Sequence, residues 1–264
     1  MLKIENVYKT FNAGTVNEKV ALRGLNLQLQ PGDFVTVIGG NGAGKSTMLN
    51  AITGVFGVDE GKILIDGVDV THLPEYKRAQ YIGRVFQDPM MGTAATMQIE
   101  ENLALAARRG KNRNLRIGIT KAEREAYMEQ LKILDLGLEN RMTAKVGLLS
   151  GGQRQALTLL MATLRKPKLL LLDEHTAALD PKTAAKVLEA TEKIVRKDNL
   201  TTLMITHNMR DAIAHGNRLV MMYEGRIVVD VSGEEKKKLT VEQLLNLFSQ
   251  ASGSDEADDK LLLS

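Results

Sequence analysis

Apolar and polar positions alternate in two segments near the start of the chain. Residues 2–7 and 20–29 follow a two-residue period, which predicts strands with one buried and one exposed face. Pro31 and Gly32 form a turn signal, and residues 35–38 are a continuous apolar run rich in β-branched side chains. We therefore expect an antiparallel β layer, followed by a buried strand.

The next segments predict a hairpin, a short helix and another strand. Residues 61–70 have the pattern of a hairpin with Asp66 and Gly67 at its tip. Residues 73–80 predict a short helix, and residues 81–86 predict a strand. This part of the chain is therefore of mixed α/β type.

The pattern becomes helical between residues 88 and 166. Residues 97–107 place apolar side chains at helical spacing. Thr120 and Glu123 form a capping box at the start of another amphipathic helix. Strand signals are scarce here, so we expect a helical insertion in an otherwise α/β chain.

Strand patterns return in the last third of the chain. Residues 169–172 and 203–206 are short apolar runs, and residues 219–223 and 226–231 predict a closing hairpin. Residues 241–248 predict a short helix, and the acidic residues beyond it are typical of a loose tail.

Composition narrows the class of protein. The chain has 264 residues, of which 44% are hydrophobic and 25% are charged, as in an ordinary soluble globular protein. The net charge of +3 is too small to argue for nucleic acid as a partner, and the absence of cysteine excludes disulfides and thiolate metal sites. Every apolar run is far shorter than the ~20 residues of a membrane helix. We expect neither a signal peptide nor a membrane span.

A glycine-rich segment follows the first buried strand. Its sequence, GGNGAGKS at residues 39–46, fits the pattern G-x-x-x-x-G-K-[ST], and a helix signal runs from there to Gly54. Glycines let backbone N–H groups surround an anion, and the helix N-terminus adds unpaired donors. In such a loop Lys45 would reach the β- and γ-phosphates as a mobile point charge, and Ser46 would hold Mg²⁺. The segment predicts nucleotide binding.

Polar side chains directly follow three of the other expected strands. Asp173 and Glu174 come after residues 169–172, where a nucleotide site would use them to hold Mg²⁺ and to activate water. Gln87 and His207 stand at corresponding positions after two further strands. Without the glycine-rich loop, the acids would be typical of helix caps and the other two of loop or structural residues.

Several features allow two interpretations. Ser150 and Gln153, in the segment LSGGQ, have the spacing of a capping box, but the glycines between them also suit a second phosphate-binding helix terminus. Phe11 or Tyr8 could stack on a base or simply pack at a strand end. The basic run at residues 108–116 suits a solvated loop or an anionic partner such as a lipid headgroup surface.

Taken together, the segments GGNGAGKST, LSGGQ, LLLLDE and AALD, with Gln87 and His207, resemble the ATP-binding cassette (ABC) ATPases of membrane transporters. The resemblance covers residues 1–231. It implies a P-loop α/β core with an antiparallel β subdomain and an inserted helical subdomain at about residues 88–166. Residues 232–264 would add a short helix and an acidic tail.

The resemblance also implies a head-to-tail dimer. Ser150, Gly151 and Gly152 of one copy would contact the γ-phosphate held by Lys45 of the other, which would give one chain two phosphate-binding segments. ATP binding would close the dimer, and hydrolysis would open it.

On matching positions, the resemblance assigns the following roles. Glu174 would polarise the attacking water, His207 would steady the γ-phosphate, and Gln87 would link Mg²⁺ to the permease contact. The catalytic set is Glu174, His207, Gln87 and Lys45, and the Mg²⁺ ligands are Ser46, Gln87 and Asp173. The nucleotide-binding set is Phe11 (stacked on adenine), Gly39, Gly40, Asn41, Gly42, Ala43, Gly44, Lys45, Ser46, Thr47, Ser150, Gly151, Gly152, Gln153 and Asp180, the last of which would signal across the dimer.

The chain departs from the family pattern at four positions. Gly40 and His175 stand where proline is common, Phe11 where tyrosine is common, and Asn208 where an acid is common. No catalytic group is lost. His175, next to the expected base Glu174, leaves the pH profile open.

These features favour the ATPase subunit of a bacterial importer, bound to the cytoplasmic face of the membrane through a separate permease. The segment VFQDPMMGTAATMQIEENL would contact the permease. The segments VFQDPMMGTAATM and DEHTAALDPKTA are similar to a bacterial branch that works with an extracytoplasmic binding protein, some members being linked to aromatic amino acid uptake. An exporter subunit remains an alternative. A soluble ABC protein acting on ribosomes or nucleic acid would carry two cassettes or a long coiled-coil insertion, and a P-loop kinase gives no role to LSGGQ.

Overall fold

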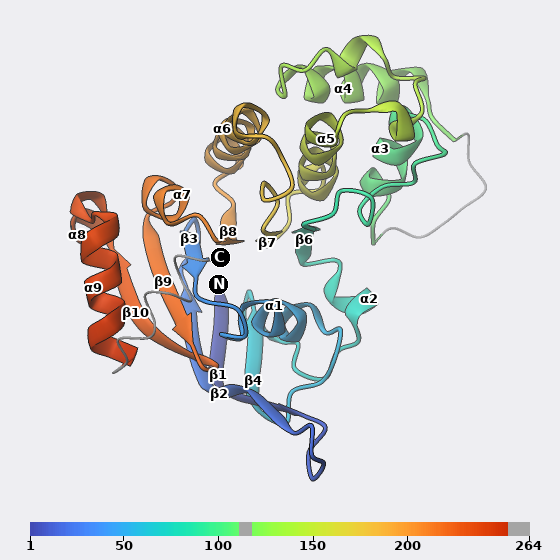
Figure 1. Ribbon diagram of the computed structural model, residues 1–264. Coiled ribbons are helices and arrows are strands. Elements are labelled where there is room, and N and C mark those ends of the chain that lie inside the picture. The colour runs from blue at the N-terminus through green and yellow to red at the C-terminus, as the bar shows by residue number, and fades with distance from the viewer. Residues whose placement is uncertain (111–117, 253–264) are drawn as a thin grey trace.

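The computed structural model describes residues 1–110 and 118–252. Most of the basic run at residues 108–116 and nearly all of the acidic tail lie outside the described residues. The described part forms two β-sheets with helices packed around them (Figure 1).

The smaller sheet is the antiparallel layer that the alternating segments predict. Its strand order is β2-β1-β4-β5, and each neighbouring pair is antiparallel. Asp66 and Gly67 have φ angles of 53° and 80°, the left-handed conformation that a two-residue hairpin turn requires. The bounds are β1 (Leu2–Phe11), β2 (Lys19–Leu29), β4 (Glu60–Ile65) and β5 (Val68–Asp69).

The larger sheet is parallel except for its last strand. Its order is β10-β9-β3-β8-β7-β6, in which β10 alone among these strands runs antiparallel to its neighbour. The closing hairpin of β9 and β10 is therefore confirmed. The bounds are β3 (Phe34–Ile38), β6 (Ile82–Val85), β7 (Leu169–Asp173), β8 (Thr201–Ile205), β9 (Arg218–Tyr223) and β10 (Arg226–Ser232).

Different layers cover the two faces of this sheet. Leu169 and Leu171 of β7 share a core with α1 and the smaller sheet, whereas Leu170 and Leu172 share a core with α5 and α6. A strand buried on both faces needs a continuous apolar run, which is why residues 169–172 are all leucine. The helices are α1 (Lys45–Thr53), α5 (Gly151–Thr163) and α6 (Pro181–Asp198).

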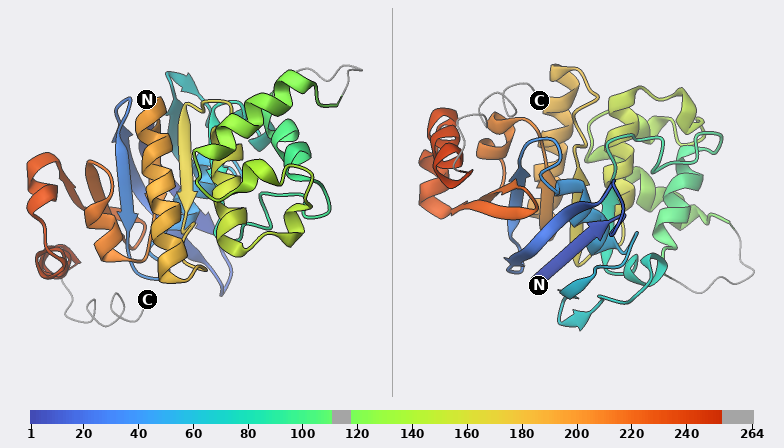
Figure 2. Two further views of the ribbon diagram at one scale, coloured as in Figure 1. Left: turned by 90° about the horizontal axis from the view of Figure 1, so that it is seen from above. Right: turned by 60° about the horizontal axis from the view of Figure 1, so that its bottom comes forward.

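The helical insertion lies to one side of the sheets (Figures 1 and 2). Its helices are α3 (Ile99–Ala107), α4 (Lys121–Lys132) and α5, with short 3₁₀ turns at Leu138–Asn140 and Val146–Leu148. The expected capping box is present, because Thr120 accepts from the Glu123 backbone and Glu123 accepts from the Thr120 backbone. Helix α5 ends at Thr163.

The short helix α2 (Glu75–Arg78) fixes the far end of α1. Helix α2 is shorter than the helix expected over residues 73–80. It begins directly after Pro74, a position where proline is tolerated, and it is one turn long. The buried Arg78 donates from Nη1 to the carbonyls of Ala51 and Ile52 at 2.7 and 2.9 Å. These bonds satisfy carbonyls near the end of α1 that have no partner within the helix.

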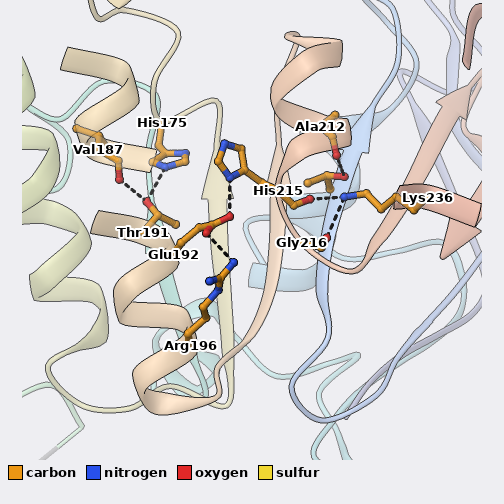
Figure 3. Close-up of polar contacts among 10 residues, drawn as sticks. His175, Val187, Thr191, Glu192, Arg196, Ala212, His215, Gly216 and Lys236 are labelled. Carbon is orange, nitrogen blue, oxygen red and sulfur yellow. Dashed lines mark hydrogen bonds and ion pairs between the residues drawn. The ribbon is translucent and has the colours of Figure 1, made fainter. Parts of the chain in front are cut away.

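The C-terminal helices pack against the β9–β10 end of the sheet. They are α7 (Met209–Ala214), α8 (Gly233–Lys238) and α9 (Val241–Ser252). The sequence did not predict α8, whose charged run lacks apolar periodicity. Lys236 of α8 is buried, and its ammonium donates to the carbonyls of His215 and Gly216 (Figure 3). The division expected after residue 231 stays a prediction.

Candidate active site

The expected functional side chains gather at one edge of the larger sheet. The P-loop follows β3, His207 follows β8, Asp173 ends β7, and Gln87 follows β6. These four strands are neighbours in the order β3-β8-β7-β6 and run parallel. Their carboxyl ends therefore meet, which is where α/β sheets bind ligands.

Backbone packing requires glycine in the P-loop. Gly39 has a φ of 153°, and a Cβ there would lie 2.3 Å from the carbonyl oxygen of Met222. Gly44 has a φ of 101°, and a Cβ there would lie 2.8 Å from the carbonyl oxygen of Ala21. The loop is thus pressed against β2 and β9 on its inner side. On its outer side, Asn41, Gly42 and Ser46 are exposed and Gly40 and Thr47 are partly exposed. The buried residues of the loop are Gly39, Ala43, Gly44 and Lys45.

Lys45 lies back against the loop that carries it. Its ammonium donates to the carbonyls of Gly39 and Gly40 at 2.5 and 3.2 Å, and the residue is 5% exposed. The reach of Lys45 to the β- and γ-phosphates stays a prediction. Burial lowers the pKa of the ammonium, and the charges of Glu174 and Asp173 oppose that shift.

Glu174 and His207 contact each other. The Glu174 Oε1 atom lies 2.6 Å from the His207 Nε2 atom, with both side chains largely buried. A carboxylate can only accept, so Nε2 carries the hydrogen in this contact. Glu174 adopts a left-handed φ of 47°, and its N–H donates to the Ile205 carbonyl at 3.1 Å. Among the described residues, the buried Nδ1 atom of His207 has no partner.

Asp173 has a partner that the sequence analysis missed. The Arg84 Nη2 atom lies 3.0 Å from the Asp173 Oδ2 atom, and the two side chains are 14% and 16% exposed. Arg84 is the one charged residue in the apolar segment YIGRVF, and a charge in an apolar strand signals a buried partner.

The oxygen groups near this edge suit Mg²⁺. Asp173 has a second carboxylate oxygen, Ser46 offers an exposed hydroxyl, and the exposed Gln87 offers an amide oxygen. Hard oxygen donors of this kind are the ligands that Mg²⁺ takes in proteins. Among the described residues, no cluster of three or more His, Asp or Glu side chains forms a metal site of its own.

The LSGGQ segment has the expected capping box. The Ser150 hydroxyl accepts from the Gln153 N–H, and the Gln153 side chain accepts from the Ser150 N–H, both at 3.2 Å. Ser150 and Gly151 are exposed. A Cβ on the buried Gly152 would lie 2.0 Å from the Thr183 Cγ2 atom of α6. The helix-start interpretation is confirmed, and a phosphate-binding role stays a prediction.

Asp180 caps the N-terminus of α6 next to this segment. Its carboxylate accepts from the Thr183 N–H at 3.1 Å. Hydrogen bonding from the Thr183 side chain, followed by this backbone bond, lowers the pKa of the Asp180 carboxyl. The AALD segment and the LSGGQ segment are therefore packed together through Thr183 and Gly152.

Phe11 has a packing partner and a polar neighbour. Its ring packs edge-on against Phe56 at a centroid distance of 5.1 Å, at the end of β1. Lys19 is the cross-strand partner of Phe11, and a Cβ on Gly42 would lie 3.8 Å from the Lys19 ammonium. Lys19 thus extends from the Phe11 end of β2 toward the P-loop. Lys19 belongs to no motif, so this position was not predicted.

The other histidines do not point into the site. His175 is 2% exposed, and its Nε2 atom lies 3.1 Å from the Thr191 hydroxyl of α6 (Figure 3). Burial, followed by the charge of His215, lowers the pKa of His175 to about 4. His215 pairs with Glu192 at 2.8 Å, and His72 is exposed.

A cleft continues from the site between α6 and α7. Its volume is about 850 Å³, and Glu174 and His207 line one part of it. Glu192, Asp211 and His215 line another part. Glu174 and His207 are thus accessible from solvent. Within residues 1–110 and 118–252, no helix is long and apolar enough to cross a bilayer.

Known proteins were compared with this chain in sequence and in fold. The family model described as "ABC transporter" matches residues 22–177. A "Tyrosine transport ATP-binding protein" of Clostridioides difficile is 46% identical over 251 residues, which is 95% of this chain and 100% of that protein. The methionine import ATP-binding protein MetN of Corynebacterium diphtheriae is 35% identical over 86% of this chain and 64% of its own length.

A solved structure gives the same result for the fold. The ATP-binding cassette MJ0796, in a dimeric post-hydrolysis state bound to ADP and Pi, is 31% identical. It superposes with a TM-score of 0.75 over 88% of this chain and 98% of its own. The family model matches more than half of the chain, a relative 46% identical is covered over its whole length, and the cassette fold is shared. The chain belongs to the ABC transporter family.

Proposed function

We propose that this protein is the ATPase subunit that powers solute uptake through a separate membrane permease of a bacterial cell. The observation that carries the proposal is the meeting of the P-loop, Asp173, Glu174 and His207 at one edge of the parallel sheet. The protein would act at the cytoplasmic face of the membrane, held there by the permease.

ATP binds with its phosphates in the P-loop. The Lys45 ammonium leaves the carbonyls of Gly39 and Gly40 and donates to the β- and γ-phosphates instead. Ser46, Gln87 and Asp173 hold Mg²⁺, which when bound neutralises charge on the phosphate oxygens. Phe11 would stack on the adenine.

His207 must leave Glu174 before it can donate to the γ-phosphate. In the structure its Nε2–H is bound to Oε1, one of the two carboxylate oxygens of Glu174. Once His207 turns its Nε2–H to the γ-phosphate, Glu174 is free to accept a proton from the attacking water. The contact seen here therefore belongs to a state that is not ready for hydrolysis.

A second copy completes the site. Ser150 and Gly151 are exposed at the N-terminus of α5, where backbone donors are available for an anion. In a head-to-tail dimer, this terminus would close over the γ-phosphate bound by the other chain, and Asp180 would lie at the junction. A dimeric cassette, MJ0796, which is 31% identical to this chain, supports this arrangement.

The permease would dock beside Gln87. Met90 and Met91, just after it, are 46% and 69% exposed. Methionine is flexible and polarizable and suits an adaptable binding surface. A partner helix that covers these side chains would also contact Gln87. Through that contact it would respond to whether nucleotide and Mg²⁺ are bound.

The solute we propose is an aromatic amino acid, delivered by an extracytoplasmic binding protein. The basis is the 46% identity to a tyrosine transport protein over the whole length of both chains. The test is uptake of labelled tyrosine into cells that carry the complete transporter. Glu174→Gln should abolish uptake. If tyrosine uptake by the Glu174→Gln variant continues at the normal rate, the proposal is refuted. If the wild-type transporter instead takes up a different solute at the expense of ATP, only the proposed substrate is refuted.

A further inference from the structure

Both acids at the end of β7 have a resident partner from a neighbouring strand. Glu174 contacts His207, after β8, and Asp173 pairs with Arg84, on β6. His207 belongs to the expected site, whereas Arg84 does not. Glu174 is therefore hydrogen-bonded to a group of its own chain, and the negative charge of Asp173 is opposed by the Arg84 guanidinium.

Strand register directs Arg84 toward Asp173. Arg84 is the parallel partner of Leu171, and Asp173 lies two residues further along β7. Residues two apart in a strand point to the same face, so all three side chains lie on the face covered by α1. The ion pair is therefore built into the sheet.

Neighbouring groups hold the Arg84 guanidinium in place. Its Cζ atom lies 4.7 Å from the centroid of the Phe86 ring, and Nη1 lies 3.4 Å from the Thr53 hydroxyl. Its buried Nε has no partner among the described residues. The unpaired Nε–H costs free energy. The ion pair with Asp173 is therefore the main interaction that compensates for burying the Arg84 guanidinium.

We propose that Arg84 is the counter-ion of Asp173 in the nucleotide-free protein and shares that carboxylate with Mg²⁺, so that it sets the Mg²⁺ concentration the site requires. This inference rests on the proposed ATPase function. A guanidinium 3.0 Å from a carboxylate weakens the attraction of that carboxylate for a second cation. The same positive charge offsets the repulsion between Asp173 and the phosphates of ATP that arrives without Mg²⁺.

The test measures nucleotide binding, not turnover. The full-length protein is titrated with a fluorescent, non-hydrolysable ATP analogue at a series of Mg²⁺ concentrations and in EDTA. Arg84→Met removes the charge and keeps a chain that packs on Phe86. Arg84→Gln also removes the charge but keeps a hydrogen bond to Asp173, which guards against misfolding, and Arg84→Lys keeps the charge.

Loss of the Arg84 charge should change both the Mg²⁺ requirement and the affinity for nucleotide in EDTA. For Arg84→Met and Arg84→Gln, the half-saturating Mg²⁺ concentration should fall by about three- to tenfold, and binding in EDTA should weaken by a similar factor. Arg84→Lys should stay close to the wild type. The matched control is Arg124→Met, which breaks an ion pair with the buried Glu100 in the helical insertion and should change neither value.

The outcomes separate this inference from the proposed function. If the variants bind nucleotide with an unchanged or higher Mg²⁺ requirement, Arg84 does not compete for Asp173 and the inference is wrong. If Arg124→Met shifts the requirement equally, the effect is one of general stability and the inference is again wrong. A wild-type protein that binds no ATP at any Mg²⁺ concentration would refute the proposed function, and the inference with it.

Discussion

The Oε1 atom of Glu174 lies 2.6 Å from the Nε2 atom of His207. The contact engages the Nε2–H that His207 would donate to a γ-phosphate, and one of the two carboxylate oxygens of Glu174. We therefore expect binding of ATP and closure of the dimer to break it, which would link turnover to assembly.

Glu174→Gln tests the base directly. The amide cannot accept a proton, so the hydrolysis rate should fall by about 10²- to 10⁴-fold. ATP should still bind and should trap the closed dimer. Phosphate release gives the rate, and light scattering with and without ATP gives the mass. A variant that hydrolyses normally would end the assignment of Glu174 as the base, and one that stays monomeric with ATP bound would contradict the shared site.

Ser150→Asn separates the two interpretations of the LSGGQ segment. Asparagine caps helices about as well as serine, so α5 should keep its stability. The longer side chain would crowd a γ-phosphate bound by the partner copy, so hydrolysis should fall at least tenfold. ATP affinity, measured on dilute monomer, should stay unchanged. A large loss of monomer affinity would mean that Ser150 binds nucleotide within its own chain, and Ser150→Ala provides the comparison in which the cap is lost.

His175 should make folding stability depend on pH. Its pKa is lowered to about 4 in the fold, below the 6.5 of an ordinary histidine, so the fold favours the neutral ring. The stability this provides is complete above pH 6.5 and is lost as the pH falls from 6.5 toward 4. The loss amounts to about 3 kcal/mol over that window.

The measurement is urea unfolding at pH 7.5 and pH 5. His175→Gln keeps a hydrogen bond to the Thr191 hydroxyl but cannot be protonated, so the difference in stability between the two pH values should shrink. The same difference in both proteins would show that other groups control it. Because the His175 ring is neutral at pH 7 and faces Thr191, we expect the ATPase pH profile near neutrality to be the same in the variant.

Local sequence signals predicted most of the fold. The capping boxes at Thr120 and Ser150, the hairpin at Asp66 and the buried run before Asp173 each depend on residues close together in the chain. The motifs also placed the candidate site residues at the correct sheet edge, because parallel strands end together.

The features that the sequence did not predict depend on residues far apart in the chain. Arg84 pairs with an acid 89 positions away, and only the adjacency of β6 and β7 brings them together. The contact of Glu174 with His207 and the folded-back position of Lys45 describe a state of the site, which motif spacing does not specify. Helix α8 forms in spite of its charged sequence, because the Lys236 ammonium donates to a backbone carbonyl of another segment.

Gly152 and Thr183 should behave as a coupled pair. A Cβ on Gly152 would lie 2.0 Å from the Thr183 Cγ2 atom, so Gly152→Ala should force α5 and α6 apart and cost about 1–3 kcal/mol of stability. Thr183→Ser removes that methyl group and keeps the backbone N–H that Asp180 accepts. Alone it should be nearly neutral.

The double variant should therefore recover most of the stability that Gly152→Ala loses, and a double-mutant cycle of urea midpoints measures the coupling. Additive effects would mean that the clash is relieved elsewhere. ATPase activity gives a second measurement, because Ser150 and Asp180 stand at the starts of the same two helices. If the LSGGQ and AALD segments move as one unit against the partner's nucleotide, restoring the packing should restore hydrolysis together with stability. Recovery of stability without recovery of hydrolysis would show instead that the position of α5 relative to α6 must be held more tightly than folding requires.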